Sequence, residues 1–105
     1  MDNRIQKIAD YYGYENQREQ FIEECSEAIL AAQKCKRYGT KEHFESFEGE
    51  VADVLIMALQ MQYILGEDHI YEIINEKLTR QMRRIEDIEG DEIWVKLRMM
   101  KNKEL

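Results

Sequence analysis

Four carboxylates are spaced so that they could bind a divalent cation: Glu24 with Glu27, and Glu50 with Asp53. An α-helix turns about 100° per residue, so residues three apart lie about 60° apart on one face and their side chains can converge. If the two helices pack antiparallel, the four acidic groups face each other beside an apolar core. Their repulsion is costly unless a cation binds between them. Oxygen ligands of this kind suit Mg²⁺, or else Mn²⁺, better than a metal that prefers sulfur.

The competing interpretation is that these acidic pairs lie on solvated helix faces. The chain has 22 Asp and Glu residues, so an isolated pair carries little information. Asp53 favours the metal site, because it stands between Val51-Ala52 and Val54-Leu55 in the most apolar part of the chain. An ion beside a core must be compensated, and no arginine lies nearby in sequence to compensate it.

Other kinds of metal or phosphate site lack their motifs. A di-iron bundle needs Glu-x-x-His, but Thr40 stands three residues before His43 and Gly66 three residues before His69. The zinc motifs Cys-x-x-Cys and His-Glu-x-x-His are absent, as are the glycine-rich phosphate loops. The histidines are therefore expected at the surface or at caps, and Cys25 as a small core residue.

The elements that would position these carboxylates are helices. The chain contains no proline, and apolar residues recur at helical spacing between its glycines. We predict an all-α antiparallel helical bundle of four to five helices in a single domain over residues 1–105. The expected elements are a short first helix ending near 11–14, helices over 15–37, 41–65 and 68–89 with a stop at Gly90-Asp91, and an amphipathic stretch over 93–100.

The segment from Val51 to Leu65 is apolar on nearly every face. A helix of this kind must be buried on all sides, which one short chain can hardly provide. This segment is therefore the predicted core of a homodimer or homotetramer.

The net charge and the cysteine content limit which partners and which cellular compartment we expect for the protein. The net charge of −7 argues against a nucleic-acid polymer as the main partner, although eight of the fifteen Lys and Arg residues fall from Lys77 onward. No apolar run is long enough for a membrane span, and no signal peptide follows Met1. On one helix, Cys25 and Cys35 would lie about 15 Å apart, too far for a disulfide. A reducing, cytoplasmic location is expected.

At its acidic motifs the chain resembles the all-α nucleoside triphosphate pyrophosphohydrolases of the MazG-like superfamily. The motifs are Glu23-Glu24-x-x-Glu27 and Glu50-x-x-Asp53, with 22 residues between them. Gln17 precedes the first motif, and the stretch from Asn75 to Arg80, Asn-Glu-Lys-Leu-Thr-Arg, follows the second. The resemblance covers roughly residues 15–85.

The resemblance implies hydrolysis of a nucleoside triphosphate between its α- and β-phosphates, giving a monophosphate and pyrophosphate. Glu24, Glu27, Glu50 and Asp53 would hold Mg²⁺, and Glu24 or Glu23 would accept the proton of the attacking water. The residues implied in substrate binding are Lys77 and Arg80, which would meet the phosphates, together with Asn75 and Gln17.

One position departs from the family pattern. Gln81 stands where many members carry a second arginine, so Arg83 or Arg84 would have to replace that arginine. This departure leaves open an alternative, a non-catalytic helical oligomer or a regulatory module that binds a nucleotide without cleaving it. The preferred base and sugar do not follow from these residues.

Overall fold

The computed structural model describes residues 1–104, with side chains as far as Lys101. It contains three helices, α1 (Asn3–Tyr38), α2 (Lys41–Leu65) and α3 (Glu67–Glu104), and no strand among the described residues. The all-α prediction is confirmed, but the described residues form three helices and not the four to five that were predicted. The chain divides into two compact units, the first being Met1–Glu67 and the second beginning at Asp68. That all residues form one domain stays a prediction.

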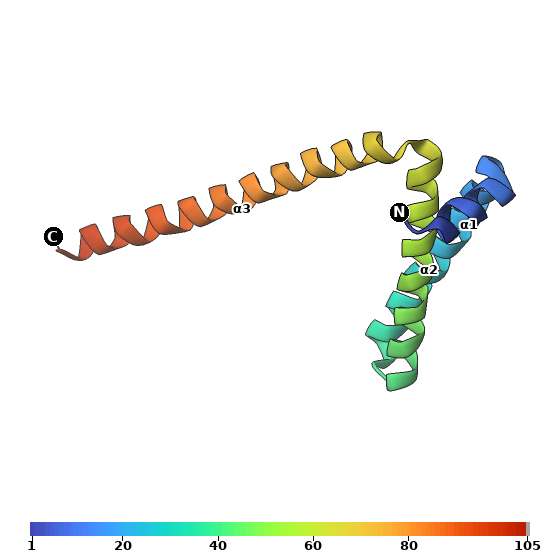
Figure 1. Ribbon diagram of the computed structural model, residues 1–105. Coiled ribbons are helices and arrows are strands. Elements are labelled where there is room, and N and C mark those ends of the chain that lie inside the picture. The colour runs from blue at the N-terminus through green and yellow to red at the C-terminus, as the bar shows by residue number, and fades with distance from the viewer. Residues whose placement is uncertain (105) are drawn as a thin grey trace. The chain divides into compact units, whose positions relative to one another are not determined.

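A two-residue connection makes α1 and α2 an antiparallel hairpin (Figure 1). Gly39 ends α1 in the left-handed conformation, φ 58° and ψ 24°, and its N–H donates to the carbonyl of Cys35 at 2.9 Å. Thr40 then caps α2, because its hydroxyl accepts from the N–H of His43 at 3.2 Å. The antiparallel packing expected of the two acidic helices is thus present.

The helix α1 bends sharply at Gly13, where φ is 79° and ψ is 168°. Only glycine adopts this region readily, since it has no Cβ. The predicted first helix and the helix predicted over 15–37 are therefore two segments of one element. The prediction placed the interruption correctly, but helical backbone resumes directly after this single residue.

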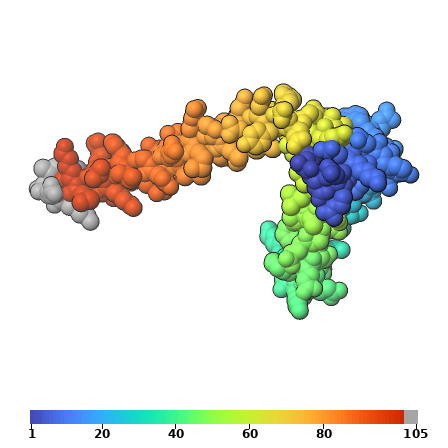
Figure 2. All heavy atoms as spheres, in the orientation of Figure 1, coloured from blue at the N-terminus to red at the C-terminus, as the bar shows by residue number. Residues whose placement is uncertain are grey.

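The segment of α1 before Gly13 packs on the C-terminal half of α2 (Figure 1). Ile5 and Ala9 are buried there, and the Tyr63 hydroxyl of α2 donates to Asp10 Oδ1 at 2.9 Å. The space-filling view shows the side chains of α1 and α2 in contact along the hairpin (Figure 2). The buried apolar residues of this unit are Ile5, Ala9, Ala31, Met57 and Met61.

The apolar helix α2 is not buried on all sides within this unit. Its exposed large apolar residues are Phe44, Val51, Leu55, Ile56, Leu59 and Leu65. One neighbouring helix covers only one face of α2, so the other faces remain open.

The helix α3 runs without interruption through Gly90 and Asp91, so the predicted stop there is wrong. A glycine inside a helix costs about 1 kcal/mol relative to alanine, which a long helix tolerates, whereas a proline would break it. Gly66, by contrast, leaves the helical conformation with φ 115° and ends α2 as predicted. None of the described helices combines the length and the apolar character needed to cross a bilayer.

Candidate metal centre and adjoining pocket

Three of the four predicted metal ligands converge between α1 and α2. Glu24 and Glu27 on α1 and Glu50 on α2 each contribute one carboxylate oxygen, and these oxygens lie within 4.8 Å of one another. The short Gly39-Thr40 connection sets the register of the hairpin and so brings Glu50 opposite the first acidic pair. We call Glu24, Glu27 and Glu50 the acidic cluster.

Asp53 lies outside the acidic cluster, contrary to the expected nest of four. It is exposed on α2, one turn beyond Glu50, and its side chain is one methylene shorter than that of glutamate. Its charge still acts on the cluster, since it is among the groups that raise the pKa of Glu27.

The charges in the acidic cluster repel one another. The pKa of Glu27 is raised above its usual value of 4.5, first by the charge of Glu24, then by burial, and then by the charges of Glu50 and other neighbours. Among the described side chains, no lysine or arginine forms an ion pair with a cluster residue. Within the described part of the chain, no ion pair therefore neutralises the negative charge of the acidic cluster.

Two oxygens of the acidic cluster also lack partners. Glu24 Oε1 accepts from Gln20 Nε2 at 2.9 Å, but Glu24 Oε2 and Glu50 Oε2 are buried without a hydrogen bond. An unsatisfied buried oxygen is costly, and the cost is larger for a charged group. A hard divalent cation would satisfy these oxygens and neutralise their charge, so the residues fit Mg²⁺ or Mn²⁺.

A small hollow of about 140 Å³ opens beside the acidic cluster. Glu27 and Glu50 line it together with Lys34 and Ser46. Lys34 places a positive charge near the carboxylates, where it would favour an anionic ligand.

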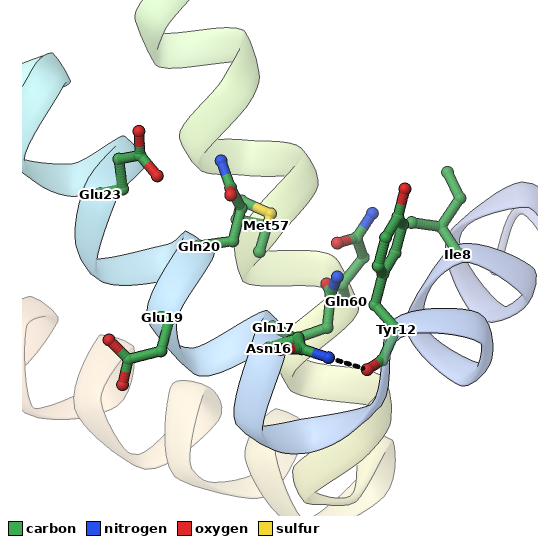
Figure 3. A pocket seen from close by; sticks show the side chains of 9 residues that line it. All are labelled: Ile8, Tyr12, Asn16, Gln17, Glu19, Gln20, Glu23, Met57 and Gln60. Atoms are coloured by element: carbon green, nitrogen blue, oxygen red, sulfur yellow. Dashed lines mark hydrogen bonds between the residues drawn. The ribbon is translucent and has the colours of Figure 1, made fainter.

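A larger pocket, of about 650 Å³, lies where α1 bends at Gly13 (Figure 3). Both segments of α1 and one face of α2 contribute to its walls. Glu23 lines this pocket, and Gln20 both lines it and donates to Glu24, so the pocket adjoins the acidic cluster. The lining residues are Ile8, Tyr12, Asn16, Gln17, Glu19, Gln20, Glu23, Met57 and Gln60.

The remaining predicted residues have different settings. Glu23 is exposed at the pocket, and Gln17 is buried in its wall. Asn75, Lys77 and Arg80 are exposed on α3, in the second unit, and their contact with substrate stays a prediction.

Sequence reasoning missed Gln20, Lys34 and Gln60. Gln20 lies four residues before Glu24, and Lys34 lies seven residues after Glu27, spacings that put each on the acidic face of α1. Gln60 is a polar residue inside the apolar run of α2, seven residues after Asp53. The spacing rule that identified the carboxylates could have found Gln20 and Lys34, whereas the only sequence signal for Gln60 is an amide inside an apolar run.

Comparisons of this chain with family models, with curated proteins and with solved structures found no match. Membership of the MazG-like superfamily therefore stays a prediction from the motifs Glu23-Glu24-x-x-Glu27 and Glu50-x-x-Asp53.

Proposed function

We propose that the protein is a Mg²⁺-dependent nucleoside triphosphate pyrophosphohydrolase that cleaves between the α- and β-phosphates. The observation that carries the proposal is the convergence of Glu24, Glu27 and Glu50 with two buried, unpartnered oxygens. A cluster of this kind suits a cation, and a triphosphate is a substrate that needs one. The adjoining pocket supplies space for the rest of a nucleotide.

The acidic cluster would hold Mg²⁺, with Mn²⁺ as a substitute. When bound, the ion would offset the phosphate charge and favour ionisation of water near neutral pH. Glu24 is engaged by Gln20 and belongs to the cluster, so it suits the ligand role. Glu23 is exposed at the pocket and outside the cluster, so its carboxylate is the better candidate to accept the proton of the attacking water. Attack at the α-phosphorus would break its bond to the bridging oxygen, which leaves with pyrophosphate.

A release screen tests this proposal. Purified protein with Mg²⁺ or Mn²⁺ should release pyrophosphate, and no orthophosphate, from at least one member of a panel of canonical and modified nucleoside triphosphates. Glu50→Gln should abolish the release while the circular dichroism stays helical. Glu48→Gln, an exposed change on the same helix outside the acidic cluster, is the matched control.

Two results would contradict the proposal. Failure to hydrolyse any triphosphate with either ion would overturn it. Tight nucleotide binding in calorimetry without turnover would instead favour the regulatory alternative.

We also propose that the protein is a homodimer or homotetramer, joined through the outer face of α2. Val51, Leu55, Ile56 and Leu59 are between 40% and 59% exposed there. Contiguous exposed apolar surface of this kind usually marks an interface. Sedimentation at micromolar concentration should show an oligomer, and Leu55→Lys should dissociate it. A wild-type monomer would refute this part of the proposal.

A further inference from the structure

We propose that the pocket at the Gly13 bend binds the nucleobase of the substrate, and that the carboxamides of Gln17 and Gln60 pair with its Watson–Crick edge. This inference rests on the proposed function, since it places the base of the same nucleotide whose phosphates would meet the acidic cluster. The proposed base-binding site is built from both segments of α1 and from α2.

The two glutamines are the most deeply buried polar side chains described. Gln17 is 3% exposed and Gln60 is 2% exposed, and the Oε1 atom of each has no hydrogen-bond partner. Buried polar atoms in folded proteins are almost always paired, because an unpaired one has lost its water without a replacement. Both residues line the same pocket (Figure 3). A ligand with hydrogen-bonding groups would supply the missing partners.

The pocket and the acidic cluster follow one face of α1. Gln17, Gln20, Glu24 and Glu27 are separated by three, four and three residues, which is helical spacing. Gln17 precedes Glu24 by seven residues, a rise of about 10 Å along the helix. A nucleotide has a matching arrangement, with a flat polar base at one end and phosphates at the other.

The charge at the pocket decides which end of a nucleotide enters it. Glu19 and Glu23 line the pocket, and no lysine or arginine is among its lining residues. Two carboxylates disfavour a phosphate there, so of the two ends of a nucleotide the uncharged base is the one that enters. The phosphates then belong beside the acidic cluster, where a cation compensates them.

The remaining walls suit a flat ring. The Tyr12 ring, Met57 and Ile8 offer apolar and aromatic surface next to the two carboxamides (Figure 3). All four bases stack well on aromatic side chains, because every base has a flat π-face. Since a carboxamide carries an acceptor and a donor side by side, it complements a base edge that carries an amino or imide N–H next to an acceptor.

The first test needs neither metal nor turnover. In EDTA, cytidine, uridine, adenosine and guanosine are titrated into ¹⁵N-labelled protein while the side-chain amide signals of Gln17 and Gln60 are followed. At least one nucleoside should shift both signals and leave that of Gln33, an exposed glutamine of α1, unmoved. The same nucleoside methylated on the donor nitrogens of its base edge should shift them much less. If millimolar concentrations of all four nucleosides leave both signals unmoved, the inference is overturned.

The second test uses variants. Gln17→Met and Gln60→Met keep the side-chain length and remove the carboxamide, and Gln33→Met is the matched control. For two triphosphates that differ only in the base, the ratio of kcat/KM should fall about tenfold or more in the two pocket variants and stay unchanged in the control. Their melting temperatures should be unchanged or higher, because an unpaired buried amide has been removed. Lower melting temperatures together with unchanged base ratios would show that the two amides only support the fold, and would refute the inference.

The two proposals fail in different ways. Shifted amide signals without any pyrophosphate release would support the base pocket and refute the proposed hydrolysis. Pyrophosphate release at rates that Gln17→Met and Gln60→Met change equally for every base would support hydrolysis and refute the base pocket.

Discussion

Removing one carboxylate from the acidic cluster should have opposite effects with and without a divalent cation. Carboxylate oxygens of Glu24 and Glu50 lie within 4.8 Å of each other. At 4.8 Å, two unit charges repel by about 1 kcal/mol at the dielectric constant of water and by 3–4 kcal/mol at an effective value of about 20. Since both side chains are only half-buried, the lower figure applies. Without metal, Glu50→Gln should therefore raise the free energy of unfolding by about 1 kcal/mol, or the melting temperature by roughly 4–8 °C for a unit of this size.

Mg²⁺ should reverse the order of stability. An ion present at 100 times its dissociation constant stabilises the wild-type fold by about 2.7 kcal/mol, a rise of roughly 10–20 °C in melting temperature. Glu50→Gln should lose most of that rise, whereas Glu48→Gln should keep it. Thermal melts followed by circular dichroism, in EDTA and in a Mg²⁺ series, measure both effects. A wild-type melting temperature indifferent to Mg²⁺ and Mn²⁺ would refute the metal site, and a destabilised metal-free Glu50→Gln would refute the repulsion argument.

Three further changes test the charge, the bend and the core. Because the pKa of Glu27 is raised by its acidic neighbours, the folded state binds its proton more tightly than the unfolded state does. The contribution of Glu27 to metal-free stability should be greatest below pH 4.5 and should fall as the pH rises through its raised pKa, so Glu27→Gln should flatten this part of the pH–stability curve. Gly13→Ala should cost about 1–3 kcal/mol in denaturant unfolding, because φ 79° and ψ 168° strain any residue with a Cβ even though no atom lies within 4 Å of that Cβ. Ala9→Leu should cost about 1–3 kcal/mol through overpacking, since Ala9 is 1% exposed, and an unchanged unfolding midpoint would contradict the packing described.

Local rules predicted the helix ends that depend on backbone chemistry. Gly39 and Gly66 end helices because each adopts a positive φ. The cap that Thr40 places on the first turn of α2 was not predicted, and it comes from the structure. Gly90 has the same sequence signal but stays helical. Glycine permits a break and does not require one, so composition alone could not separate these positions.

The candidate site was predictable where spacing on a single helix decides it. Glu24 and Glu27 had to share a face, and the short connection to α2 made Glu50 their natural neighbour. The exclusion of Asp53 from the cluster depends on side-chain length and on the exact register of two helices, which no spacing rule contains. The pocket could not be predicted from the sequence for a related reason. It forms because the chain bends at Gly13, and only the three-dimensional structure shows the direction of that bend.

The bend at Gly13 separates one wall of the pocket from the acidic cluster within the first unit. Residues 3–12 supply one wall of the pocket through Ile8 and Tyr12, whereas every member of the acidic cluster comes from the helices beyond the bend. Substitutions in this N-terminal segment can therefore reshape the wall without displacing a carboxylate. If the pocket binds the base and the acidic cluster binds Mg²⁺ as proposed, a library confined to residues 3–12 should change ligand preference and leave cation binding intact.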